Sequence, residues 1–186
     1  MVDTTLLGAI RTALRENEIG DQSPYVLSYA GKGDSGGSFG AFQGDVHVDE
    51  VARDTLKAVL QSANLDAETV TRILTAVSQP CPNGSPLDPE DQKAADSALS
   101  SEKGRALVDA MDDSIFQRIL AQLDTSLDAA GSINRKLDPG AQISIALWAN
   151  MTGPPTTLND WLRGTPVNDV SPPADATVTQ EDWSEC

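Results

Sequence analysis

Aromatic residues and cysteines are scarce in this chain. Aromatic side chains make up 4% of the 186 residues, so aliphatic side chains and alanine must build most of the core. The two cysteines, Cys81 and Cys186, lie far apart and neither belongs to a metal-type cluster, so their pairing depends on geometry that the sequence does not give. The acidic residues do not reproduce the spacing of a calcium loop. The sequence therefore predicts no metal site, and we expect no cofactor.

Long apolar segments are also missing. No stretch approaches the ~20 consecutive apolar residues that a membrane-spanning helix requires. The N-terminal segment reads MVDTTLLGAIRTALREN and lacks the basic start and long apolar run of a signal peptide. We therefore expect neither a signal peptide nor a membrane span in this sequence.

Basic residues are few. The chain has 13 Lys and Arg against 28 Asp and Glu, which gives a formal net charge of −15. Nucleic acids and anionic membranes bind basic surfaces, so we expect no nucleic-acid partner and no membrane partner. Long-range attraction favours a cationic or neutral ligand instead, although an acidic surface also simply keeps a protein in solution. The length suits one domain, and we expect a monomer.

The apolar periodicity indicates a chain built mostly from helices. Residues 3–17 carry apolar side chains at helical spacing, including Ile10 and Leu14. Further helices are expected from residue 49, after Asp66, from Asp88-Pro89, over residues 105–123, from Asp138-Pro139 and over residues 157–163. We predict an α+β fold that is mostly α, with a single domain over residues 1–164 and an irregular C-terminal tail over residues 165–186.

The segment between residues 16 and 45 differs from the helical remainder. Glu16 and Glu18 lie at the end of the first helix, with Glu18 one turn beyond Leu14 at the border of the apolar stripe. A pair of solvated glutamates is the simplest interpretation of such a helix end. A segment rich in Gly and Ser follows, with a turn over residues 32–37 and a strand expected over residues 38–43. We expect Phe39 and Phe42 to anchor this hairpin to the helices.

One string in this segment is misleading. Residues 33–37 read GDSGG, as around the nucleophilic serine of trypsin-like proteases. Serine catalysis needs a histidine base held by an acid, and the chain's one histidine, His47, follows the serine in a helix-rich sequence. We therefore reject a trypsin-like protease. A Ser35–His47 dyad on another fold stays formally open, and a structural role for Cys81 is favoured over a Cys81–His47 dyad.

Hydrolysis of a glycosidic bond suits the segment better. It needs a general acid and, usually, a second group that handles water or stabilises positive charge on the sugar. A glutamate at the apolar edge of a helix provides the first, and an acid or hydroxyl on a facing hairpin provides the second. Glycines let the hairpin backbone approach a sugar ring closely.

Two short motifs resemble the lysozyme superfamily. Residues 38–43, SFGAFQ, resemble the second hairpin strand of phage-type lysozymes and the G-L-M-Q signature of lytic transglycosylases. In those families a glutamate ends the preceding helix, which points to Glu18. Separately, Glu16-Asn17 and Gly33-Asp34 are similar to the catalytic Glu-Asn and Gly-Asp pairs of the inverting chitosanase family.

The resemblance implies a lysozyme-like helical domain with one small β-hairpin and a glycoside hydrolase activity on an aminosugar polymer. The residues that it implies are catalytic Glu18, Glu16 and Asp34, and substrate-binding Ser38, Gln43, Asn17, Asp45 and Tyr29. No acid stands nine residues after Glu18, where phage-type lysozymes carry their aspartate, so the second catalytic group stays open.

Four functions stay open as well. We favour cleavage of peptidoglycan, the substrate most frequent in the superfamily. The acidic charge favours cationic chitosan, and a non-catalytic glycan-binding module is a further alternative. An interaction protein whose acidic surface docks a basic partner belongs to a different class. A polysaccharide substrate places the protein outside the cytoplasm, although the sequence shows no signal peptide.

Overall fold

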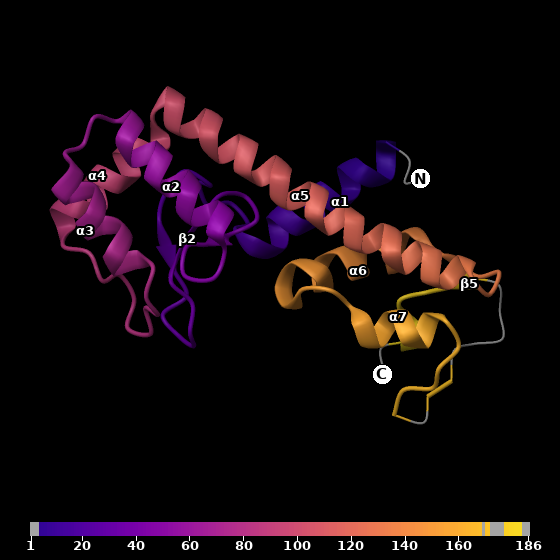
Figure 1. The fold of residues 1–186 in the computed structure, drawn as a ribbon. Helices are drawn as coiled ribbons and strands as arrows, with labels where there is room; N and C mark the ends of the chain where they lie inside the picture. The colour runs from indigo at the N-terminus through magenta and orange to yellow at the C-terminus, as the bar shows by residue number, and fades with distance from the viewer. Residues whose placement is uncertain (1–3, 169, 172–176, 184–186) are drawn as a thin grey trace. The chain divides into compact units, whose positions relative to one another are not determined.

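The computed structural model describes residues 4–168, 170–171 and 177–183. It is 60% helical, which confirms the predicted α+β, mostly α class (Figure 1). The helices are α1 (Thr4–Glu18), α2 (Glu50–Ser62), α3 (Ala67–Val77), α4 (Pro89–Ser100), α5 (Glu102–Gly131), α6 (Pro139–Thr152) and α7 (Thr156–Leu162), with a short 3-10 helix at Glu181–Trp183. The strands are β1 (Ser28–Tyr29), β2 (Gly37–Phe39), β3 (Gly44–Asp45), β4 (Lys136–Leu137) and β5 (Thr177–Val178).

The chain divides into two compact units. We call residues 18–115 the central unit, and residues 1–17 together with 116–186 the terminal unit. The central unit contains β1 to β3, α2 to α4 and the first part of α5, up to Ile115. The terminal unit contains α1 up to Asn17, the rest of α5, and the elements that follow it in sequence.

Aspartates begin four of the helices. The carboxylates of Asp49, Asp66, Asp88 and Asp138 each accept hydrogen bonds from backbone N–H groups in the first turn of the helix that follows. These N–H groups have no partner within the helix, so each aspartate supplies one that the helix lacks. The helix starts predicted after Asp66, Asp88 and Asp138 are confirmed.

The buried side chains of the central unit come from all its elements. They include Phe39 and Phe42 from the sheet segment, Leu56 and Leu60 from α2, Ile73 and Val77 from α3, Leu99 from α4, and Met111 from α5. Aliphatic side chains dominate this set, as the low aromatic content predicts. Helix α2 packs against both α3 and α4, so these three helices and the sheet share one core.

The terminal unit is organised around the second half of α5 and helices α6 and α7. Trp161 is fully buried, and its indole Nε1 donates to the carbonyl oxygen of Val170. Ser126 Oγ donates to Asn159 Oδ1 at 2.6 Å inside the unit. Strands β4 and β5 pair in parallel, so residues 177–178 of the C-terminal segment belong to a regular element. Cys186 lies outside the described residues, and its pairing with Cys81 stays untested.

Two boundaries differ from the sequence prediction. The strand expected over residues 38–43 ends at Phe39, because Gly40 takes φ +85° and Gln43 takes φ +52°, which turn the chain out of the extended conformation. Helix α5 is longer than the predicted 105–123 run. Among the described residues, no helix is both long and apolar enough to cross a membrane.

An ion pair joins α3 to α4. Arg72 donates from Nε and from its terminal nitrogen to the two carboxylate oxygens of Asp91, at 2.6 and 2.7 Å. Asp91 is 5% exposed, whereas the Arg72 side chain is half-exposed. The hydrogen bonds from Arg72 hold the pKa of Asp91 below its usual value. The two-pronged geometry fixes the separation of the two helices as well as their charges.

Replacing Asp91 tests this pair. Asp91→Asn is expected to lower the free energy of unfolding near neutral pH, because Arg72 loses its charged acceptor. A carboxyl whose pKa is lowered by folding stabilises the protein above its unfolded value, about 3.9, and loses that effect as the pH falls through its folded value. Denaturant titrations should therefore show the difference between wild type and variant beginning to shrink near pH 4 and disappearing only below the folded pKa of Asp91.

The matched control for that change is Glu90→Gln. It removes the same charge one residue earlier, from an exposed side chain in the same helical turn. We expect it to change stability little at any pH. A stability loss in Asp91→Asn that is the same at neutral and acidic pH would contradict the role assigned to the ion pair.

Candidate functional site

The chain leaves α1 at Glu18 and enters a three-stranded antiparallel sheet in the order β1-β2-β3. Ser38 pairs with Ser28 on one side and with Asp45 on the other. A Cβ atom on Gly36 would lie 2.5 Å from the carbonyl oxygen of Val77, at the end of α3. The glycines of the GDSGG string therefore allow the sheet segment to pack closely against α3, which is a structural use of that string.

The expected anchors of this segment are buried. Phe39 is fully buried and Phe42 is 3% exposed, which confirms that both are packed inside. Phe39 ends β2, whereas Phe42 belongs to the turn that follows. The two rings hold the sheet segment through apolar burial, and this leaves its polar groups to be paired separately.

Helix α4 supplies partners for β1. The backbone N–H of Leu27 donates to Asp96 Oδ1 at 2.9 Å. The Tyr29 hydroxyl donates to Gln92 Oε1 at 2.9 Å, and Gln92 Nε2 donates in turn to Asp96. Burial is the main cause that raises the pKa of Tyr29 to about 12. Tyr29 was expected to bind substrate, but here its hydroxyl is bonded to α4.

Helix α5 supplies two more carboxylates. The Tyr25 hydroxyl donates to Asp109 Oδ1 at 2.8 Å, and this hydrogen bond is the main cause that raises the pKa of Tyr25. The Arg105 guanidinium lies over the Tyr25 ring, 5.1 Å from its centroid. One turn beyond Asp109 along α5, Asp112 accepts the backbone N–H of Ala41 at 2.8 Å.

Gly40 sits directly against this last contact. Its φ of +85° lies in the region that favours glycine, and a Cβ atom there would lie 2.5 Å from Asp112 Oδ1 and 2.7 Å from Met111 Cε. Asp112 itself is 6% exposed. Gly40 therefore satisfies two requirements at once, the direction of the turn and the close approach of α5.

Asp45 organises the other end of the sheet. Its carboxylate accepts the Ser35 hydroxyl at 2.6 Å, the Gly36 N–H at 3.1 Å and the His47 N–H at 2.8 Å. With these three donors, the carboxylate joins the residues just before β2 to the residues just after β3. Asp45 was expected to bind substrate, and that role stays a prediction, but its oxygens already accept hydrogen bonds within the sheet segment.

Gln43 and Ser38 differ in how far their side chains are available to a ligand. Ser28 Oγ donates to Gln43 Oε1 at 2.7 Å, and Gln43 Nε2 lies 3.3 Å from the carbonyl oxygen of Gly40. The Gln43 amide is therefore held in place while keeping one N–H group beyond these two bonds. Ser38 is 7% exposed, so little of its side chain is open to a ligand.

The three residues at the end of α1 fall in different units. Glu16 and Asn17 are exposed and belong to the terminal unit. Glu18 is partly buried, precedes the buried Ile19 and opens the central unit. The structure thus brings Glu18 into one compact unit with the predicted site residues Asp34, Ser38, Gln43, Asp45 and Tyr29.

Asp34 lies in the turn between β1 and β2. Gly31 and Gly33 both take φ +64° in this turn, and Asp34 is exposed. The described part of the chain holds no hydrogen bond or ion pair to its carboxylate. Asp34 therefore has more open surroundings than Asp45, the other predicted site carboxylate of the sheet segment.

The alternative nucleophiles have other partners. Ser35 is bonded to Asp45, whereas His47 Nδ1 lies 2.8 Å from the carbonyl oxygen of Ser78. Burial, followed by the charge of Asp45, raises the pKa of the Cys81 thiol, which disfavours a thiolate. This arrangement favours a structural role for Ser35, His47 and Cys81 over either dyad.

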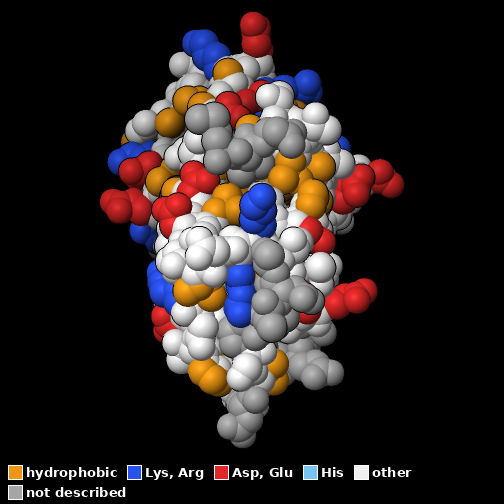
Figure 2. All heavy atoms as spheres, turned by 90° about the vertical axis from the view of Figure 1, so that its right-hand side faces the viewer, with side chains coloured by type: hydrophobic (Ala, Val, Ile, Leu, Met, Phe, Trp, Pro, Cys, Tyr) orange, Lys and Arg blue, Asp and Glu red, His pale blue; other side chains and the backbone are white. Residues whose placement is uncertain are grey.

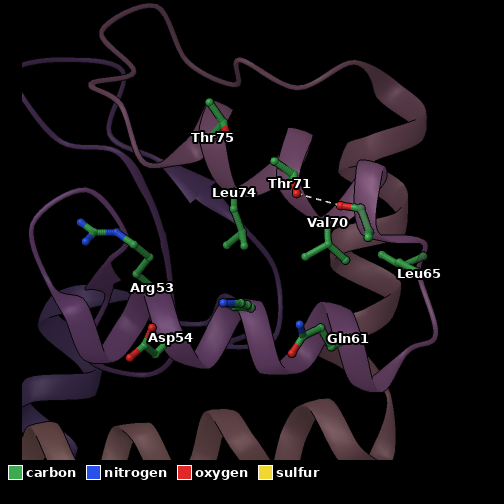
Figure 3. A pocket seen from close by; sticks show the side chains of 10 residues that line it. Arg53, Asp54, Gln61, Leu65, Val70, Thr71, Leu74 and Thr75 are labelled. Carbon is green, nitrogen blue, oxygen red and sulfur yellow. Dashed lines mark hydrogen bonds between the residues drawn. The ribbon is translucent and has the colours of Figure 1, made fainter.

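The sequence did not reveal a groove between α2 and α3. It has a volume of about 530 Å³ and is shown in Figure 3. Its lining residues are Arg53, Asp54, Lys57, Gln61, Leu65, Ala67, Val70, Thr71, Leu74 and Thr75. None of the predicted site residues lines it. A possible sequence signal was the pair of basic residues one turn apart on a helix whose opposite face is apolar.

Charge does not single out one place on the face shown in Figure 2, where acidic side chains are interspersed with basic and apolar ones. Within the described residues, no group of three His, Cys, Asp or Glu side chains is placed to hold a metal ion. No protein-family model matches the chain, and neither a curated protein nor a solved structure shows significant similarity to it.

Gly40 provides a direct test of how the sheet is held. Gly40→Ala should destabilise the protein through the positive φ, by about 1–2 kcal/mol, and through the clash with Asp112 and Met111, by about 1–3 kcal/mol more. Gly84→Ala is the matched control, because Gly84 takes φ +91° with no atom within 4 Å of an added Cβ. Equal losses in denaturant titrations of the two variants would show that α5 does not press on the turn.

Proposed function

We propose that the protein is a glycoside hydrolase that cleaves β-1,4 bonds of an aminosugar polymer, with Glu18 as the general acid. One observation supports this most strongly. Glu18, a partly buried carboxylate at the end of α1, opens the same compact unit as the glycine-rich sheet that follows it. A helix end holds a carboxylate in a fixed direction, and glycines beside it let a sugar ring come close.

Asp34 is the second carboxylate in this proposal. A glycosidase that inverts configuration uses one carboxyl as acid and another as base, and the base activates a water molecule. Asp34 is exposed, in a turn of the sheet segment, whereas the Asp45 carboxylate already accepts three donors. An available carboxylate suits a base that must meet water better than one whose oxygens are engaged.

Substrate recognition would draw on the sheet segment. Gln43 keeps an amide N–H beyond its two internal hydrogen bonds, and this group can donate to a hydroxyl or N-acetyl oxygen. Asn17 is exposed but belongs to the terminal unit, so its expected role in sugar binding stays a prediction. The buried Ser38 and the bonded Tyr29 would act by shaping the sheet rather than by touching the sugar.

We favour peptidoglycan as the polymer, since the resemblance in residues 38–43 is to enzymes of that class. Chitosan is the alternative, and the net charge of −15 is the specific observation in its favour, because a polycation is attracted to an acidic protein. Both substrates place the cleaved bond between aminosugars, so one assay format serves both.

The test is release of reducing ends from purified peptidoglycan and from chitosan. Glu18→Gln keeps the shape of the side chain but removes its proton, and we expect activity to fall by about 10²–10⁴-fold. Glu16→Gln is the control, two residues away and exposed, and it should retain most activity. Loss in Glu16→Gln with full activity in Glu18→Gln would show that Glu16 is the acid. No release by folded wild type from either polymer would favour a glycan-binding module.

Asp34→Asn tests the second carboxylate. If Asp34 activates water, turnover should fall by about 10²–10⁴-fold with little change in stability, because the side chain is exposed. Asp21→Asn removes the same charge from another exposed position of the central unit and should leave turnover almost unchanged. Unchanged turnover in Asp34→Asn would remove it from the mechanism.

A further inference from the structure

The groove between α2 and α3 has features of a second binding site. We propose that it binds a small amphipathic anion, a carboxylate on a short unbranched apolar chain. Its volume of about 530 Å³ lies within the range of small-molecule sites, roughly 300–1,000 Å³. The inference does not depend on the proposed glycosidase, since none of the residues assigned to catalysis lines the groove.

Two cations mark one side of the groove. Arg53 and Lys57 stand one turn apart on α2, and both line it. Arg53 Nε donates to the carbonyl oxygen of Val46 at 3.1 Å, and its terminal nitrogen donates to that of His47. These two bonds fix the direction of the guanidinium and use two of its five N–H groups, which leaves three for an anion.

Lys57 adds a second positive charge. The described part of the chain holds no ion pair or hydrogen bond to its ammonium group, although the chain as a whole carries a net charge of −15. Asp54, which follows Arg53 on the same helix, is the one acidic residue of the lining. The groove therefore carries a net charge of +1 from Arg53, Lys57 and Asp54, which favours a singly charged anion.

The rest of the groove suits an apolar chain. Val70 and Leu74 come from α3 and point toward α2, while Leu65 lies at the opposite end of the groove from Arg53 (Figure 3). Arg53 and Gln61 both line the groove and are eight residues apart on α2, so the groove extends about 12 Å along that helix. A carboxylate at Arg53 and Lys57 would direct its chain along Val70 and Leu74 toward Leu65.

The same lining disfavours other ligand classes. None of its ten residues is aromatic, so it offers no ring on which a sugar or a nucleobase can stack. The Thr71 hydroxyl donates to the carbonyl oxygen of Ala67 within α3, at 2.8 Å, so its proton is engaged (Figure 3). A cation would meet Arg53 and Lys57. These features leave an anion with an apolar body as the best match.

Octanoate is a suitable probe, with octan-1-ol and butyrate as comparisons. Titration into the isotope-labelled full-length protein, followed by NMR, should shift backbone amides of α2 and α3 in a saturable way with octanoate. Octan-1-ol lacks the charge and butyrate lacks most of the chain, so each should bind at least tenfold more weakly. Equal binding of octan-1-ol, or shifts that lie outside α2 and α3, would overturn the proposal.

Matched charge reversals complete the test. Lys57→Glu should weaken octanoate binding at least tenfold, because a charge-assisted contact becomes a repulsion. Lys93→Glu makes the same change at an exposed position of α4 outside the groove and should have little effect. Circular dichroism checks that both variants fold. An equal loss in both variants would mean that octanoate senses only net charge, and no loss in Lys57→Glu would mean that it binds elsewhere, so either result rejects the site.

Discussion

Hydrogen bonds to three aspartates hold the sheet segment of the central unit against its helices. Asp96 on α4 accepts the N–H of Leu27, while Asp109 and Asp112 on α5 accept the Tyr25 hydroxyl and the Ala41 N–H. The segment has strands of only two or three residues, so its own ladder is too short to fix it. Helices α4 and α5 therefore determine where the proposed substrate-facing loop lies.

The acidic residues of the chain have structural roles as well as a charge. Many of its carboxylates act as acceptors inside the structure: four aspartates begin helices, three hold the sheet segment, Asp45 closes a loop and Asp91 binds Arg72. A charge of −15 is thus partly a consequence of building with aspartate, and it supports a cationic substrate less directly than the composition suggests.

The helix starts could be predicted from local signals in the sequence. The end of β2, the α2–α3 groove and the partners of the site residues depend on contacts between segments far apart in the chain. Asp66 and Asp138 predict helix starts because capping involves only the next few residues. The strand expected through Gln43 stops at Phe39, where Gly40 takes a positive φ and lies close to Met111 and Asp112 of α5, over seventy residues away in sequence. The α2–α3 groove escaped detection for the same reason, since it exists only where two helices face each other. Of the candidate site, burial of Phe39 and Phe42 was predictable, whereas the partners of Asp45 and Tyr29 were not.

The proposed activity is hydrolysis of a bond between sugars. Mass spectrometry of the soluble fragments released from peptidoglycan and chitosan by the full-length protein tests it most directly. We predict glycan fragments that carry a new reducing end and gain the mass of one water molecule for each bond cleaved. Intact glycan strands after prolonged incubation with folded protein, or fragments cut only within peptide cross-links, would contradict the claim.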